Sequence, residues 1–172
     1  HRGSAAPGIP RRAGFAARLK GIRVVELARE VLAIADEGLR RQAADRAFAR
    51  AMGELVGDYG DDLDARTIYA ESLMDLRPWN YWTRDGQPYE ETREIEKSLQ
   101  YVIAKNPNHP GALHYWIHLW EPTDTPERAE AEADRLLTLM PGAGHVVHMP
   151  AHIYMRVGRH AEHVRRAPLA RE

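Results

Sequence analysis

Apolar residues recur at helical spacing along most of the chain, and no segment alternates between apolar and polar residues as a half-buried strand would. Clusters of proline, glycine and aspartate interrupt this pattern at GDYGDDLD, RPWNYWTRDGQP, NPNHPG, EPTDTP and MPGAG. The pattern therefore predicts an all-α fold. The expected helices lie near residues 21–37, 40–57, 63–76, 90–105, 110–120, 125–139, 145–157 and 159–166.

The predicted helices are short, and so are the connections between them. Such helices pair as antiparallel hairpins, which either form a bundle or stack as repeats. An internal repeat favours the stack. Two pairs of histidines provide one, because the second pair follows the first by 34 residues. The pairs are His114 with His118 and His148 with His152.

Other residues follow the same interval. Pro107 and Pro141 are 34 residues apart, and each closes the helix before a histidine pair. Small or apolar residues of the second helix in each hairpin also align. These are Ile95, Leu99 and Val102, which correspond to Ala129, Ala133 and Leu136. With Tyr154, Gly158 and Arg159 at the last turn, the chain resembles the tetratricopeptide repeat family, whose unit is a helical hairpin of about 34 residues.

An earlier unit contains extra residues. The segment 64–76, DARTIYAESLMDL, aligns with GALHYWIHLWEPT at an offset of 47, and the stretch 76–88 accounts for the excess over 34. We interpret 76–88 as an insertion in the turn of a hairpin. The sequence thus predicts a flexible tail at 1–12 and a single helical-repeat domain at 13–172. Its units are expected at about 41–60 (partial), 61–107 (with the insertion), 108–141 and 142–166.

The resemblance covers roughly residues 41–163 and has departures from the family pattern. Trp116 and Pro150 are unusual residues for a first helix, and His163 stands where the family usually has alanine. The resemblance implies a right-handed α-solenoid in which the first helices of successive units line a concave groove. It implies that both histidine pairs face this groove, together with Thr67 and Glu71 of the earlier unit.

The histidines have the spacing of metal ligands. Residues four apart share one face of a helix, so each pair can converge on one point. Imidazole nitrogen with a carboxylate oxygen suits zinc, iron, copper or nickel, whereas calcium and magnesium prefer oxygen. These side chains could hold one ion with an open position, or two ions. The candidate ligands are His114, His118, His148, His152, Glu71 and His145, the last of which precedes His148 by one helical turn.

Two other interpretations of the histidines stay open. Polar groups in the groove of a repeat protein often bind a peptide or a small anionic ligand, and a histidine can also be purely structural.

Pro150 lies between His148 and His152, and a proline inside a helix removes a backbone hydrogen bond and kinks the helix. If the helix instead begins at Pro150, where proline is tolerated, His148 caps it and the pair no longer shares one face.

The insertion gathers aromatic side chains. Trp79, Tyr81 and Trp82 follow Pro78, which stops the preceding helix. They either form a lid or wall of a substrate-binding pocket, or pack the insertion onto the repeats. Trp116 and Trp120 are four residues apart on a face rotated from the histidines, which favours core packing.

Composition excludes several classes of function. The net charge is −1, which gives no electrostatic attraction to nucleic acid, and no apolar stretch has the length of a membrane helix, so we expect a soluble protein. The chain has no cysteine, which excludes disulfides and thiolate metal ligands. Neither HExxH nor GxSxG occurs, and a glycine-rich phosphate loop is also missing. The acidic GDYGDDLD lacks the ligand spacing of a calcium loop and is expected to form a turn and a helix N-cap.

The sequence therefore leaves two functions open. The first is a metal-dependent protein, with iron, copper or zinc in the groove, that acts on a small molecule; its residues do not distinguish an oxidoreductase from a hydrolase. The second is a non-catalytic tetratricopeptide-like scaffold that binds a peptide or a partner protein in the same groove. The small number of repeat units also suggests that the chain is part of a longer array or assembles with further copies of itself.

Overall fold

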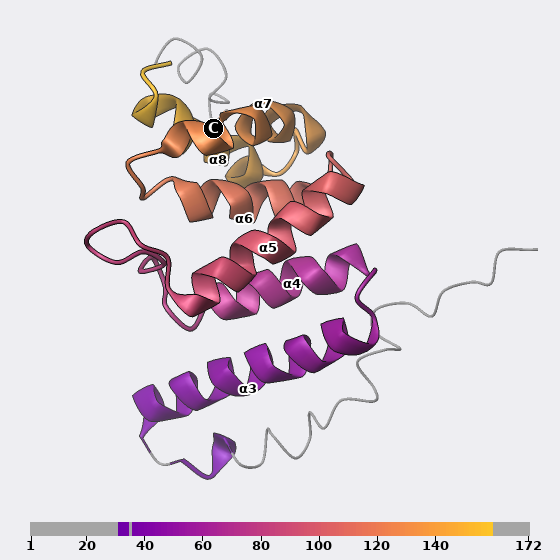
Figure 1. Ribbon diagram of the computed structural model, residues 1–172, viewed down its shortest axis with the longest axis vertical. Coiled ribbons are helices and arrows are strands. Elements are labelled where there is room, and N and C mark those ends of the chain that lie inside the picture. The colour runs from indigo at the N-terminus through magenta and orange to yellow at the C-terminus, as the bar shows by residue number, and fades with distance from the viewer. Residues whose placement is uncertain (1–30, 35, 160–172) are drawn as a thin grey trace, which may run out of the picture.

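The computed structural model describes residues 31–34 and 36–159. Within these residues the named elements are all helical (Figure 1), which confirms the predicted fold class. They are α3 (Glu37–Asp58), α4 (Leu63–Met74), α5 (Glu90–Lys105), α6 (Pro110–Trp120), the 3-10 helix η1 (Pro126–Ala129), α7 (Glu130–Leu139) and α8 (Gly144–Arg156). The predicted tail at 1–12, most of the helix predicted at 21–37 and nearly all of that at 159–166 lie outside the described residues.

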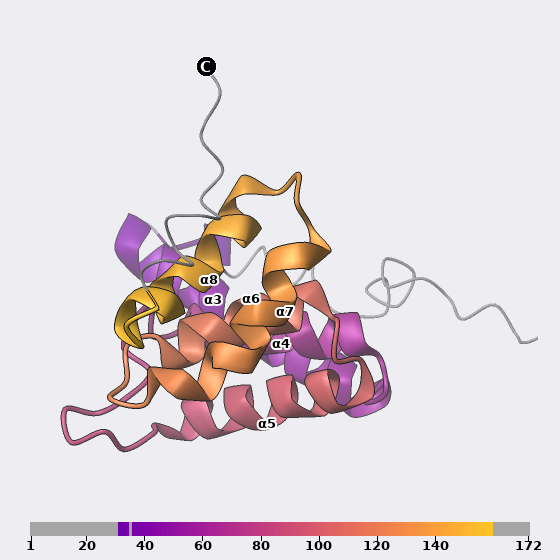
Figure 2. The same ribbon diagram turned by 90° about the horizontal axis from the view of Figure 1, so that it is seen from above.

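The helices follow one another along the long axis of the molecule. Each packs against the next in the chain, and α6 also contacts both α4 and α8 (Figure 1). Seen from above, α5 runs along one edge of the stack (Figure 2). The helix α6 is therefore central, in contact with helices that precede and follow it in the chain. In the described residues, no helix is long and apolar enough to cross a bilayer.

The core consists of the apolar faces of these helices. Six aligned packing positions of the sequence repeat are all fully buried, which confirms their assignment to the interior. They are Ile95, Leu99, Val102, Ala129, Ala133 and Leu136. Trp116 and Trp120 are 6% and 2% exposed, as core packing requires. Burying each large apolar side chain contributes roughly 1.5–3 kcal/mol, so this interior fixes α5, α6 and α7 against one another.

Capping residues explain where the helices begin. Asp62 accepts a hydrogen bond from the backbone N–H of Ala65 at 2.9 Å, so GDYGDDLD contains the N-cap of α4, as predicted. Asp36 caps α3 in the same way through Leu39. The prediction of one helix over 21–37 and another from residue 40 is therefore wrong at this boundary, because α3 begins directly after Asp36.

The helix α8 runs through Pro150 without ending. It extends from Gly144 to Arg156, so the alternative in which the helix begins at Pro150 is wrong. The proline lacks the N–H that would bond one turn back. Met149 and Ile153 are buried on either side of it, and this packing offsets the lost bond. The rings of His148 and His152 consequently stay close, with centroids 4.8 Å apart.

Candidate metal centre

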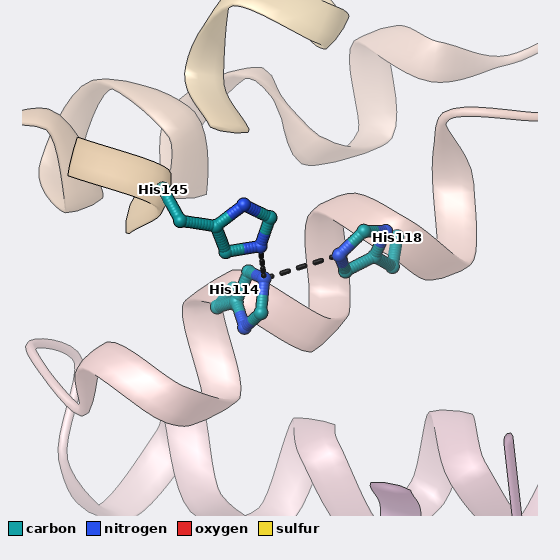
Figure 3. A group of neighbouring side chains, drawn as sticks. All are labelled: His114, His118 and His145. Atoms are coloured by element: carbon teal, nitrogen blue, oxygen red, sulfur yellow. Dashed lines mark hydrogen bonds between the residues drawn. The ribbon is translucent and has the colours of Figure 1, made fainter. Parts of the chain in front are cut away.

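Three imidazoles from two helices meet beside α6. His114 and His118 lie one turn apart on α6, and His145 lies in the first turn of α8 (Figure 3). Leu113 and Ile117, the residues just before these two histidines, are fully buried in the core. The apolar face of α6 therefore turns His114 and His118 toward α8, where the contact between the two helices brings His145 against them.

The ligand nitrogens are close enough to hold one ion. His114 Nε2 lies 3.1 Å from His145 Nε2 and 3.1 Å from His118 Nε2. The ligand nitrogens of the three residues all lie within 4.8 Å of one another. Zinc–nitrogen bonds of about 2.0–2.1 Å in a tetrahedral site would place two ligand nitrogens about 3.3 Å apart. The two separations from His114 Nε2 thus come close to the nitrogen–nitrogen spacing around such an ion.

Burial keeps two of these rings neutral. Desolvation, followed by the neighbouring His145, lowers the pKa of His114 to about 4. Desolvation, followed by the neighbouring His114, His145 and His152, lowers the pKa of His118 to about 4. Only a neutral imidazole has a lone pair for a metal, so these two rings are in the ligating form at neutral pH.

The contacts within the group leave polar atoms without partners. Only one hydrogen fits between two nitrogens 3.1 Å apart, and the nitrogen that accepts it must be bare. His118 Nδ1 is buried and has no hydrogen-bond partner. A positive ion in place of the shared hydrogens would satisfy all three Nε2 atoms at once, which supports the fit of the group to a metal.

The other predicted ligands lie near this group but are not part of it. His148 and His152 face each other on the next turns of α8, and His152 Nδ1 lies 2.7 Å from Glu121 Oε1. Glu71 on α4 is hydrogen-bonded to Tyr115 on α6, and burial followed by this bond raises the pKa of Tyr115. The structure therefore brings together His114, His118 and His145.

Glu121 was not predicted as a site residue. It directly follows α6 and lies three residues after His118, which places it on the same side of the helix. The spacing of His114, His118 and Glu121 along one face was the available signal. His109 also has a role that the sequence did not indicate, because its Nδ1 accepts the backbone N–H of Ala112 and caps α6.

The aromatic insertion has two parts with different roles. Tyr81 is 6% exposed, and Trp82 donates its indole N–H to the carbonyl of Leu119 at 2.9 Å, so these two residues pack the insertion onto α6. Trp79 is 63% exposed, and its ring stands edge-on to His118 with centroids 5.1 Å apart. Trp79 therefore lies beside the histidines, whereas the packing interpretation applies to Tyr81 and Trp82, and a pocket wall at Trp79 stays a prediction.

No family model matches the chain, and neither the curated proteins nor the solved structures contain a match to it. The resemblance to tetratricopeptide repeats therefore stays a prediction from the sequence. Function has to be inferred from the geometry and chemistry of the histidine group.

Proposed function

We propose that the protein binds a transition-metal ion through His114, His118 and His145. The convergence of the three Nε2 atoms is the observation that carries this proposal. Their separation fits the bond lengths of a first-row metal, and the pKa values of His114 and His118 leave these rings neutral. Three fully solvated histidines in chance contact would lack the burial that lowers the pKa values of His114 and His118.

The donor atoms limit the metal. Three neutral nitrogens without thiolate suit zinc, iron or copper and are a poor site for calcium or magnesium. Three protein ligands also leave at least one coordination position for water or a substrate, as in catalytic rather than closed structural sites. We therefore propose that the ion acts on a small molecule, as a Lewis acid or a redox centre.

Trp79 supports access of a small molecule to the open position. Its ring borders His118 but stays largely exposed, so it covers one side of the group without closing it. A flat apolar ring next to a polar site is a common wall of a ligand pocket. Tyr81 and Trp82 would contribute by anchoring the insertion rather than by contact with the ligand.

The arrangement of helices as a tetratricopeptide-like solenoid is also a proposal. The helices α4, α6 and α8 begin at Leu63, Pro110 and Gly144, in agreement with the sequence offsets of 47 and 34. Contacts of α6 with both α4 and α8 are those expected between first helices of successive hairpins. In such an array the histidine group would lie on the side lined by these first helices.

Metal analysis tests the proposed function. Protein purified without nickel affinity and stripped with a chelator is titrated with Zn²⁺ and Co²⁺ by calorimetry. One equivalent is expected to bind to the unmodified protein, and His114→Ala and His145→Ala are expected to lose at least a hundredfold in affinity. His109→Asn is the matched control, because it removes an imidazole from the same helix and keeps a capping side chain.

The opposite result has a clear meaning. If the unmodified protein binds neither ion, or if the alanine variants bind as tightly as His109→Asn, the metal centre is excluded. Binding of a peptide or protein that survives in the same variants would then favour the scaffold function.

A further inference from the structure

Glu121 joins the two groups of histidines. Its Oε1 lies 2.7 Å from Nδ1 of His152 on α8, and its own backbone follows the last turn of α6, which carries His118. The side chain is only 23% exposed. Its second oxygen, Oε2, is buried and has no hydrogen-bond partner. A buried carboxylate with one oxygen occupied and the other unpaired calls for a second donor nearby.

The bond to Glu121 fixes the protonation of His152. A carboxylate accepts hydrogen bonds and cannot donate them, so Nδ1 of His152 carries the hydrogen. In the neutral ring Nε2 is then bare. This is the arrangement by which carboxylates orient metal-binding histidines in proteins. The sequence predicted His152 as a ligand, and its bare Nε2 has the chemistry that this role requires.

His118 needs an acceptor of the same kind. Its Nε2 belongs to the histidine group, so as a ligand the ring must carry its hydrogen on Nδ1. That Nδ1 is buried without a partner, and Glu121 Oε2 is a buried acceptor without a partner three residues further along. Residues three apart are neighbours on a helix surface. The two atoms are not hydrogen-bonded to each other in the structure, but the residues that carry them lie three apart on one side of α6, so a change of side-chain rotamer would bring the donor to the acceptor.

We propose that Glu121 is the outer-sphere carboxylate of the histidine centre: it would hold His118, a ligand of the proposed ion, with Nδ1 protonated and Nε2 bare, and it holds the neighbouring His152 in the same form. This rests on the proposed function, because the role of Glu121 is to orient rings toward the ion. Oε1 already pairs with His152, and Oε2 would accept the hydrogen of His118 Nδ1 when that ring binds the ion, so a single side chain would align rings from α6 and α8. Glu121 is a positioning residue and does not itself contact the ion.

The first test determines which ring nitrogen carries the hydrogen in each histidine of the metal-free protein. Long-range ¹H–¹⁵N spectra at neutral pH report which ring nitrogen of each histidine is protonated. The unmodified chain is expected to show Nδ1–H for both His118 and His152. Glu121→Leu removes both acceptors, and both rings are expected to shift toward Nε2–H. Glu121→Gln keeps one acceptor oxygen and is expected to retain the original form at only one of the two rings.

The second test measures metal affinity in the same variants. Loss of an outer-sphere partner is expected to weaken Co²⁺ binding by about 10- to 100-fold, with one equivalent still bound and an altered visible spectrum. Glu132→Gln is the control, since it removes a carboxylate paired with Arg135 at 3.2 Å elsewhere. It is expected to leave both the histidine spectra and the cobalt affinity unchanged. Circular dichroism identifies any variant that fails to fold. If Glu121→Leu is unfolded, the result for Glu121→Gln, which keeps the shape of the side chain, decides whether Glu121 positions the rings.

The outcomes separate this inference from the proposed function. Cobalt binding by the unmodified protein, with unchanged affinity and unchanged ring protonation in both Glu121 variants, overturns the role of Glu121 alone. Two bound equivalents that fall to one in Glu121→Gln also overturn it, because Glu121 would then be a ligand of a second ion. No cobalt binding by the unmodified protein overturns the proposed function and this inference together.

Discussion

The indole of Trp79 packs edge-on against the imidazole of His118, with ring centroids 5.1 Å apart and planes inclined by 72°. This contact connects the insertion to the histidine group. The backbone of Trp79 has a φ of 62°, a left-handed conformation that residues with a Cβ rarely adopt. The insertion therefore holds the ring beside His118 at a conformational cost.

The strain at Trp79 can be measured with two truncations. Trp79→Gly and Trp79→Ala both remove the ring, but only alanine retains the steric cost of the left-handed backbone. We expect Trp79→Gly to be more stable than Trp79→Ala by about 1 kcal/mol in urea unfolding, even though glycine has the more flexible unfolded chain. Equal stability, or a more stable alanine variant, would contradict the strained conformation.

Stability of the metal-free protein is expected to fall in mild acid. The pKa values of His114 and His118 are lowered to about 4 in the folded protein, below the ordinary value of 6.5. The unfolded chain therefore binds more protons between pH 6.5 and 4, so the stability present above 6.5 is lost as the pH falls through this window. Urea midpoints between pH 7.5 and 4.5 measure the effect. His114→Gln/His118→Gln is expected to show a shallower pH dependence, and a slope equal to that of the unmodified protein would contradict the prediction.

Metal retention is expected to persist further into acid than an ordinary histidine site allows. Protons compete with the ion for imidazole nitrogen, and this competition begins near the pKa of the free ring. Because burial lowers the pKa of His114 and His118 to about 4, zinc should remain bound at pH 5.5 and be released as the pH approaches 4. Equilibrium dialysis with elemental analysis checks this. Release that is complete at pH 5.5 would show that these two rings do not control binding.

The buried face of α7 is expected to contribute strongly to the stability of the fold. Leu136 is fully buried, so Leu136→Ala should cost about 2–5 kcal/mol through lost burial and the cavity left behind. Leu39→Ala on α3 is the control, since Leu39 is 57% exposed and its truncation should change stability by less than about 0.5 kcal/mol. Denaturant unfolding compares the two, and similar losses would disprove the assignment of the core.

Much of the fold could be predicted because helical periodicity and turn residues are local signals. The starts of α4, α6 and α8 were predicted within one residue, and the repeat interval identified buried positions such as Leu99 and Ala133. The start of α3 was missed because its N-cap, Asp36, lies inside the apolar pattern that predicted one helix over 21–37. The division of 125–139 into η1 and α7 was not visible in the pattern either.

The histidine site was predicted less completely, for a geometric reason. Equivalent positions in two repeats suggested that His148 should match His114, yet His145 is the residue that meets it. The sequence interval fixes how far along each helix a residue lies, but not how two packed helices are shifted and rotated against each other. That shift brings the first turn of α8 beside His114. The acceptor role of Glu121 depends on the same relationship and could not be inferred from the repeat.

The histidine group draws its members from helices that are not consecutive in the chain. His114 and His145 are separated by 31 residues, and η1 and α7 lie between them. An ion bound to both would close this segment into a loop. Closure would reduce the conformational entropy of the unfolded chain, and binding would stabilise the state in which α8 packs against α6. Of the described helices, α7 and α8 could then not separate from α6 without first releasing the ion. The rate of local opening between α6 and α8 would therefore decrease as the concentration of free metal increases.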